Sequence, residues 1–309
     1  MKESIKVLSV NISKEKETIK IPLDEITLNH HGVMNDAHSG SRHRQVSLLG
    51  KESYDRLEEK AKKTIGFGEF AENITTEGIE LFKTSPLDRF VGENVELEVS
   101  QTNKECKHNS AFGEIDSNML VEEGIFARVI KQGSLKAGDI LKYVPRILRF
   151  QVVTLSDRAS KGESEDHSRP MIVEILQQYF QDRPRNIEVE STVIPADAAN
   201  LSLIMEKSAY EEIDVLITTG GTGIGPRDIT IETIKPMLDK EIPGIMEMIR
   251  IKHGAQDPNA LINRGIAGVV SDTLVYTLPG SGKAIRGYME EILKTLEYLI
   301  YMHHGLVIE

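Results

Sequence analysis

The sequence predicts an α/β protein of two domains: a β-rich barrel or sandwich over residues 1–144, then a three-layer α/β/α domain with a mostly parallel sheet over residues 148–309. Three observations predict this class. Up to about residue 144, short apolar runs alternate with polar residues between turn signals. Beyond it, strand-like and helix-like segments alternate. Pro145 interrupts strand pairing between the two patterns, and 309 residues suit about two domains.

Short strands dominate the first domain. Apolar–polar alternation predicts strands at residues 6–12, 18–26, 94–99, 126–130 and 139–144. Turn residues gather at residues 91–94 and 136–139. Only residues 52–63 read clearly as an amphipathic helix. Many short strands with one helix are typical of a barrel or a sandwich.

Strands and helices alternate in the second domain. Strands are predicted at residues 150–155, 187–194, 215–218 and 273–278. Helices are predicted at residues 171–180, 201–209 and 284–302. This alternation indicates a parallel sheet that carries helices on both faces.

The composition excludes several functional classes. A formal net charge of -11 disfavours nucleic acid as a partner, because an acidic surface repels phosphate backbones. No stretch approaches the roughly 18 apolar residues of a membrane span, and the charged N-terminus is unlike a signal peptide. The single cysteine, Cys106, permits no intrachain disulfide. We therefore expect a cytoplasmic protein that acts on small molecules and has no membrane partner.

Polar and glycine residues follow the four predicted strands of the second domain. Ligands of open parallel sheets bind beyond the carboxyl ends of the strands, so these residues are the candidate site. In chain order they are Ser156, Asp157, Arg158, Asp166, Ser168, Asp197, Thr219, Gly220, Gly221, Thr222, Gly223, Asp228, Pro279, Gly280 and Ser281.

The glycine loop at residues 219–223 is the strongest signal. Glycines let backbone N–H groups approach an anion closely, and a helix predicted to begin near Thr230 adds a positive dipole end. A phosphate-bearing ligand suits this loop; the alternative is a tight turn without a ligand. Pro226 and Asp228 exclude a dinucleotide-binding glycine fingerprint, and Thr277 and Ala284 exclude a Walker A loop around residues 282–283.

Asp197 and Asp228 are the candidate catalytic carboxylates. Mg²⁺ is usually held by one or two carboxylates together with substrate phosphates, and it neutralises charge that develops on them. Two aspartates at adjacent strand ends therefore predict a Mg²⁺ site. The alternative for Asp228 is a helix cap.

Residues 149–304 resemble the molybdopterin-binding family, which includes the molybdopterin adenylyltransferases. The resemblance rests on residues 156–158, 218–223, 227–230, 241–244 and 278–280. It implies MgATP and molybdopterin as substrates, adenylated molybdopterin and pyrophosphate as products, a trimer, and an acidic pair at Asp197 and Asp228. The chain departs from the family pattern at Arg169, where glycine is usual, at Gly282, where proline is usual, and at the extra residue before Asp197.

Residues 5–144 resemble the MOSC family. The resemblance rests on residues 32–40, 44–49, 71–78, 104–106 and 123–129, and it implies a β-barrel that binds the cofactor or carries sulfur on a cysteine. It points to Asp36, His38 and Arg44 as contacts for an anion or cofactor. Cys106, beside two lysines and a histidine, is the candidate sulfur carrier; an ordinary half-buried cysteine is the alternative. The histidines here lack regular metal-ligand spacing.

Three functions follow from these resemblances. The first is an enzyme of molybdenum cofactor biosynthesis that adenylylates molybdopterin. The second is a non-catalytic module that binds and delivers the finished cofactor, and the third is a sulfur carrier that acts through Cys106. The expected partners are other cofactor-biosynthesis proteins, molybdoenzymes and further copies of the chain; pyridoxal phosphate is a secondary expectation.

Overall fold

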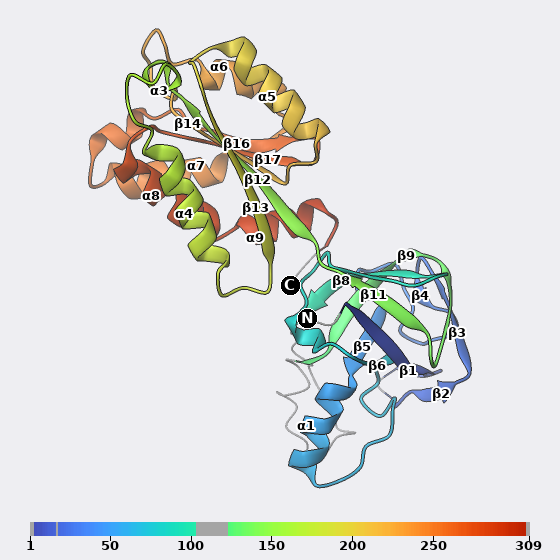
Figure 1. Cartoon of the computed structure of the whole chain (residues 1–309). Coiled ribbons are helices and arrows are strands. Elements are labelled where there is room, and N and C mark those ends of the chain that lie inside the picture. Colours follow the sequence, from blue (N-terminus) through green and yellow to red (C-terminus); the bar gives the residue numbers. More distant parts are fainter. Residues whose placement is uncertain (1–2, 17, 103–122, 307–309) are drawn as a thin grey trace. The chain divides into compact units, whose positions relative to one another are not determined.

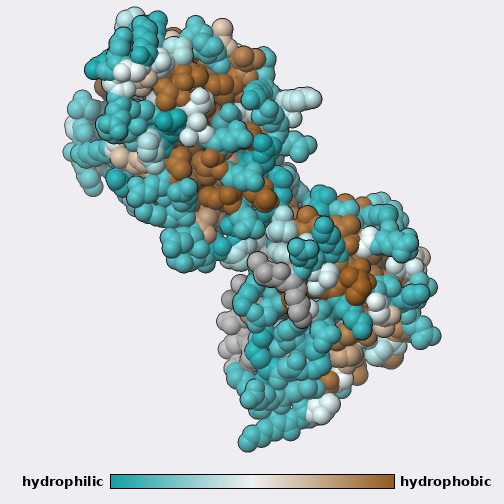
Figure 2. All heavy atoms as spheres, viewed as in Figure 1, coloured by the Kyte–Doolittle hydropathy of each residue, from teal (hydrophilic) through white to brown (hydrophobic). Residues whose placement is uncertain are grey.

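The computed structural model describes residues 3–16, 18–102 and 123–306 (Figure 1). Contacts divide the chain into two compact units. The first comprises Met1–Arg146 with Gly305–Glu309, and the second comprises Ile147–His304. In the described part of the chain, no helix is long and apolar enough to cross a membrane. Hydrophilic side chains cover much of the visible face of each unit, with apolar side chains between them (Figure 2).

A closed β-barrel forms the first unit. Its strands follow the order β11-β7-β8-β9-β5-β6-β1, and pairing of β1 with β11 closes the ring. The barrel strands are β1 Ser4–Ile12, β5 Val46–Gly50, β6 Ile74–Glu77, β7 Arg89–Val91, β8 Glu96–Thr102, β9 Ile125–Lys131 and β11 Ile140–Val144. The sequence pattern left a barrel and a sandwich open, and the closed ring decides for the barrel.

Smaller elements complete the first unit. The strand predicted at residues 18–26 is two strands, because β2 pairs with β1 whereas β3 turns away to pair with β10. The predicted helix is α1, and Tyr54 and Leu57 bury its inner face. These elements are β2 Ile21–Leu23, β3 Glu25–Asn29, β4 Gly32–Val33, α1 Lys51–Ala61, η1 Leu81–Lys83 and β10 Gly133–Lys136.

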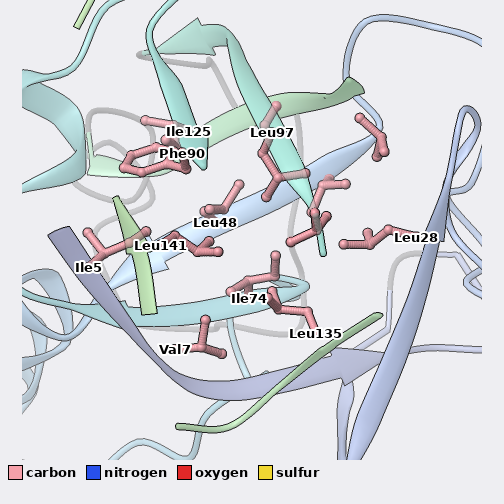
Figure 3. Close-up of a cluster of buried hydrophobic side chains, with 14 of the residues drawn as sticks. Ile5, Val7, Leu28, Leu48, Ile74, Phe90, Leu97, Ile125, Leu135 and Leu141 are labelled. Atoms are coloured by element: carbon pink, nitrogen blue, oxygen red, sulfur yellow. The ribbon is translucent and has the colours of Figure 1, made fainter. Parts of the chain in front are cut away.

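Inward-pointing aliphatic side chains fill the barrel (Figure 3). Along β9 buried and partly buried residues alternate, as the two-residue period of a strand requires. Tryptophan is absent from the chain, so branched aliphatic residues and Phe90 supply most of this core. Residues labelled in Figure 3 include Ile5, Val7, Leu48, Ile74, Phe90, Leu97, Ile125 and Leu141.

The second unit is a three-layer α/β/α domain, as predicted. Its sheet has the order β13-β12-β14-β17-β16-β15; β13, β12, β14 and β17 run parallel, and β16 and β15 form an antiparallel edge. Both faces of β12 and β14 are buried, as expected for central parallel strands. The strands are β12 Ile147–Leu155, β13 Asn186–Ile194, β14 Val215–Thr219, β15 Lys240–Glu241, β16 Ala267–Val270 and β17 Thr273–Leu278.

Helices cover both faces of this sheet. Figure 1 shows α5 and α6 on one face and α4 and α8 on the other. Leu201 and Met205 of α5 pack with Leu216 of β14, whereas Ile172 and Leu176 bury the inner face of α4. The helices are α3 Asp157–Ser160, α4 Ser168–Phe180, α5 Ala198–Tyr210, α6 Thr230–Ile234, η2 Lys235–Met237, α7 Pro243–Gly254, η3 Pro258–Ile262, α8 Gly282–Leu293 and α9 Leu296–His303.

One predicted helix is wrong in extent. Residues 284–302 were expected to form a single helix, but the structure has α8 and α9 with a break at Lys294 and Thr295. At this break the backbone N–H and the side chain of Thr295 both bond the carbonyl of Ile292. Such local bonding competes with the regular helical pattern, and it explains the interruption.

Candidate functional site

The carboxyl ends of four parallel strands lie in one row. In the strand register, Leu155 at the end of β12 pairs with Ile194 at the end of β13. Thr219 at the end of β14 pairs with Thr154 on one side and with Leu278 on the other. All four loops that carry the sequence-predicted residues therefore leave the sheet at the same edge.

The strand order reverses direction at this edge, between β12 and β14. The chain passes from β12 to β13 on one side and then returns to β14 on the other side of β12. Crevices at such reversal points are the usual ligand sites of open α/β sheets. The candidate site therefore centres on the loops after β12 and β14.

Gly220 is where the β14 loop meets the end of β12. Its φ is +99°, and a Cβ there would lie 2.5 Å from the carbonyl oxygen of Leu155. The loop is also bound to the β17 end: Gly220 N–H donates to the carbonyl of Leu278 at 3.0 Å, and the Thr219 hydroxyl donates to that of Pro279 at 2.9 Å. Only glycine fits this conformation and this close approach.

Two residues hold four consecutive carbonyls of the glycine loop. The hydroxyl and N–H of Thr230 donate to the carbonyls of Gly220 and Gly221, at 2.8 and 3.1 Å. The N–H and Nε of Arg264 donate to the carbonyls of Thr222 and Gly223, at 3.1 and 2.7 Å. The carbonyls of residues 220–223 are thus all turned back into the domain.

The N–H groups of the same peptides consequently face the other way. In a trans peptide the N–H of one residue points opposite to the preceding carbonyl. The N–H groups of residues 221–224 have no hydrogen-bond partner among residues 3–16, 18–102 and 123–306. Successive unpaired backbone N–H groups form a concavity that binds anions. This row is the main feature of the candidate site.

Asp157 links the loops after β13 and β14. Its Oδ1 accepts from Ala196 N–H at 3.0 Å, and its Oδ2 accepts from Arg227 Nε at 2.9 Å. The Arg227 guanidinium and the Ala196 N–H hold the pKa of this carboxyl below its ordinary value, so it is ionised at neutral pH. Because Ala196 precedes Asp197 and Arg227 precedes Asp228, Asp157 connects the two segments that carry the predicted acidic pair.

The two acidic residues are themselves differently placed. Asp197 is the N-cap of α5, and its Oδ1 accepts from Asn200 N–H at 3.0 Å. Asp228 does not cap α6, whose N-cap is Ile229. Instead its Oδ2 accepts from Gly225 N–H at 2.7 Å, which places the carboxylate against the turn that ends the glycine loop.

The strands that precede Asp197 and Asp228 are not neighbours, contrary to the expectation from the sequence, because β12 lies between β13 and β14. The two carboxylates nevertheless suit a hard cation. Each uses one oxygen for a backbone N–H, and no hydrogen bond to the other oxygen is formed within the described part of the chain. Carboxylate oxygen is the ligand type that Mg²⁺ prefers. The described residues include no group of three or more histidine, cysteine, aspartate or glutamate side chains suited to a metal, so substrate phosphates would have to supply further ligands.

The loop after β12 reaches the β17 loop. Ser168, at the start of α4, donates its hydroxyl to the carbonyl of Gly280 at 3.1 Å. Asp166 accepts from the N–H groups of Ser168 and Arg169 through Oδ1, and its Oδ2 lies 3.3 Å from Arg169 Nε. The arginine that departs from the family pattern is therefore paired with Asp166.

The remaining predicted residues of this edge lie at helix starts. Ser156 caps α3 and accepts from Ala159 N–H at 3.2 Å, and Arg158 is exposed on that helix. Ser281 caps α8 in the same way, with Ala284 N–H at 3.4 Å.

Comparison with known proteins shows which protein family the second unit resembles. Residues 151–298 match the family described as "Probable molybdopterin binding domain". The molybdenum cofactor biosynthesis protein B of Staphylococcus aureus is 35% identical over 162 residues, which are 50% of this chain and 92% of that protein. The chain belongs to the molybdopterin-binding family.

Other relatives of this molybdopterin-binding chain match the same half. A molybdopterin adenylyltransferase of Pyrococcus furiosus is 35% identical over 52% of this chain and 94% of that protein. Among solved structures, the tungsten cofactor synthesizing protein MoaB from Pyrococcus furiosus has 32% sequence identity to this chain. The match covers 52% of this chain and 99% of the MoaB chain, with a TM-score of 0.46. Residues 35–142 match the MOSC domain.

The MOSC domain carries the other predicted contacts. Asp36 is buried, and its carboxylate binds Lys20 Nζ at 2.5 Å and the N–H groups of Ser13 and His38. These bonds are internal, so the carboxylate is committed to the fold. Arg44 Nε donates to Gln101 Oε1 at 2.5 Å, and the His38 side chain is partly exposed. The candidate sulfur carrier, Cys106, lies outside the described residues.

Sequence reasoning missed the residues that support the glycine loop at residues 219–223 of this molybdopterin-binding domain. Asn263 and Arg264 lie between η3 and β16, in a stretch for which no element was predicted. Tyr288 lies on α8, where its position reads as a buried helical residue. Their role depends on the tertiary fold, and no local pattern in the sequence indicates it.

Proposed function

We propose that this chain works in molybdenum cofactor biosynthesis and that its second unit transfers AMP from MgATP to molybdopterin. The observation that carries the proposal is the row of unpaired N–H groups at residues 221–224, which faces away from the carbonyls that Thr230 and Arg264 hold. Both substrates bear phosphate. The relatives named as cofactor-biosynthesis proteins and as an adenylyltransferase support this choice of substrates.

The transfer exchanges one phosphorus–oxygen bond for another. An acceptor oxygen of molybdopterin attacks the α-phosphorus of ATP, and the bond to the β-phosphate breaks, so pyrophosphate leaves with the electron pair. Mg²⁺, when bound, neutralises charge on the phosphate oxygens. Asp197 and Asp228 are the residues that would hold it. The N–H groups of residues 221–224 would bind and orient a substrate phosphate, which lowers the barrier by positioning.

Asp157 has a supporting role in this proposal. A carboxylate repels phosphate, and both of its oxygens already accept hydrogen bonds. We therefore assign it to positioning of the Asp197 and Asp228 segments and not to contact with the substrate. Arg169, paired with Asp166, is compatible with an open site, because its charge is held at the start of α4.

The remaining expectations belong to the same proposal. The substrates are small molecules, and the partners are other proteins of cofactor biosynthesis, molybdoenzymes and further copies of this chain in a trimer. For the MOSC domain, cofactor binding through His38 and Arg44 is the proposed role. Sulfur transfer through Cys106 is its alternative.

The test is a reconstitution with the full chain. Purified protein is incubated with molybdopterin and MgATP, and adenylated molybdopterin and pyrophosphate are measured. We expect both products only when both substrates are present, and at least about a hundredfold slower turnover for Asp228→Asn, as for loss of a strong transition-state interaction. Tight molybdopterin binding without ATP consumption would instead indicate the delivery module.

A further inference from the structure

We propose that Asn263 is a positioning residue that makes the Thr222 hydroxyl a hydrogen-bond donor toward the substrate phosphate. The inference rests on the proposed phosphate site and assigns a specific polarity to it. Asn263 follows η3 and Thr222 lies in the glycine loop, and the Asn263 Nδ2 to Thr222 Oγ1 distance is 2.6 Å. The argument depends on which of these two groups donates.

Two donors fix the orientation of the Asn263 amide. Gly265 N–H donates to Asn263 Oδ1 at 2.8 Å, and the Tyr288 hydroxyl donates to the same oxygen at 2.9 Å. A backbone N–H has no acceptor capacity, so the atom that faces it must be the oxygen. Burial raises the pKa of Tyr288, so its hydroxyl keeps its proton at neutral pH.

The fixed orientation of the Asn263 amide determines the direction in which the Thr222 hydroxyl can donate. Because Asn263 Nδ2 donates, Thr222 Oγ1 must accept, and the hydroxyl proton has to find another acceptor. Thr222 is buried, with 3% of its surface exposed, and its hydroxyl reaches no acceptor in the described part of the chain. A buried donor without an acceptor is costly, which favours a ligand that supplies one.

The backbone of the same residue points to the same ligand class. The N–H of Thr222 belongs to the unpaired row at residues 221–224, so this residue offers two donors without a partner, its N–H and its hydroxyl proton. Its carbonyl is taken by Arg264 N–H at 3.1 Å. Arg264 in turn is held by an ion pair with Glu232. The segment after η3 therefore fixes both the backbone and the side chain of Thr222 for an anion.

Asn263→Asp reverses this polarity at almost constant shape. One oxygen of the new carboxylate accepts from Gly265 and Tyr288, and the other replaces Nδ2 and draws the Thr222 proton to itself. A hydrogen bond to a charged group contributes about 1.5–3 kcal/mol, so we expect the dissociation constant of the phosphate ligand to rise about tenfold to a hundredfold. Molybdopterin and MgATP are titrated separately, which shows whose phosphate the loop takes.

A double-mutant cycle separates polarity from simple charge repulsion. In a Thr222→Val background there is no hydroxyl to redirect, so Asn263→Asp should raise the dissociation constant only through charge repulsion, by several-fold less than in the wild-type background. An effect of equal size in both backgrounds would show that the new charge acts alone, and would overturn the inference. Thr222→Ser keeps the hydroxyl and should bind like the wild type.

Two further outcomes keep the inference apart from the proposed function. Equal binding by wild type and Asn263→Asp overturns the role of Asn263 and leaves the adenylylation proposal standing. Binding of neither ligand by the wild type overturns both. Should Asn263→Asp fail to fold, as judged by circular dichroism, the comparison of Thr222→Val with Thr222→Ser still decides: equal affinities would show that the hydroxyl donates nothing. In the reconstitution with molybdopterin and MgATP, we expect Asn263→Asp to raise KM more than it lowers kcat.

Discussion

The conformation of the glycine loop at residues 219–223 depends on a few individual residues. Gly220 lies against Leu155 with a positive φ, and Thr230 and Arg264 hold the carbonyls of residues 220–223. Each of these interactions turns a backbone N–H group outward. The chain has a formal net charge of -11, so binding of an anion has to rely on such local donors.

Gly220→Ala tests the loop at this scale. The new Cβ would lie 2.5 Å from the Leu155 carbonyl at a φ of +99°, so the loop must shift. We expect a loss of about 1–3 kcal/mol in the free energy of unfolding, with a weaker affinity for phosphate ligands. Gly244→Ala is the matched control, because nothing lies within 4 Å of its Cβ position. Chemical denaturation measures both, and equal stability of the two variants would contradict the account.

Substitution of Asp36 tests the buried ion pair between Asp36 and Lys20 in the MOSC domain. Burial alone would raise the pKa of Asp36, but its hydrogen bond with Lys20 and the backbone N–H groups of Ser13 and His38 outweigh burial and lower it. Asp36→Asn leaves the Lys20 ammonium buried without its partner, which should cost about 3–5 kcal/mol of stability. Lys20→Met should cost less, because the N–H groups of Ser13 and His38 and the side-chain amide of Asn73 still donate to the carboxylate. A larger loss for Lys20→Met in urea unfolding would reverse this assignment.

At the scale of elements, the sequence predicted the strands of the second unit and the edge at which their loops meet. It did not predict the residues that hold those loops in place. Periodicity located β12, β13, β14 and β17, and the rule for parallel sheets placed their loops at one edge. The break between α8 and α9 was missed, because side-chain bonding by Thr295 is invisible to periodicity. Asn263 was missed because its partners are distant in sequence.

Substitution of Asp157 tests the link between the loops that follow β13 and β14. The Asp157→Asn variant weakens the bond to Arg227 and so loosens the link between the loops after β13 and β14. We expect turnover to fall about tenfold while circular dichroism is unchanged, since misplacement near a reacting centre costs one to two orders of magnitude. Glu163→Gln is the control, because Glu163 follows α3 without an ion pair among the residues described. Unchanged turnover of Asp157→Asn would remove its positioning role.

At the scale of the whole molecule, the chain holds two units with separate cores, and the barrel carries a buried acid. Burial raises the pKa of Glu72, although Thr75, Tyr54 and Gly68 donate hydrogen bonds to its Oε1. Its Oε2 is buried and forms no hydrogen bond within the described part of the chain. The folded barrel therefore keeps the proton of Glu72 to a higher pH than the unfolded chain does.

This acid gives the barrel a pH-dependent stability. The unfolded chain releases the proton near the ordinary pKa of 4.5, whereas the folded barrel releases it only at higher pH. Stability from Glu72 is therefore present below pH 4.5 and falls as pH rises toward the folded pKa. Glu72→Gln mimics the protonated acid, so it should match wild type near the lower pH and be more stable at pH above the folded pKa. Hydrogen exchange of barrel amides against pH measures this, and parallel curves would refute it.

The most direct test of the shared edge is a crystal structure of the full chain with molybdopterin and MgATP. The account predicts a phosphate oxygen about 3 Å from the backbone nitrogens of Thr222 and Gly223. It also predicts that this phosphate lies at the same edge of the sheet as Asp197 and Asp228. A phosphate bound at the opposite edge, near Asp214 at the start of β14, would contradict it.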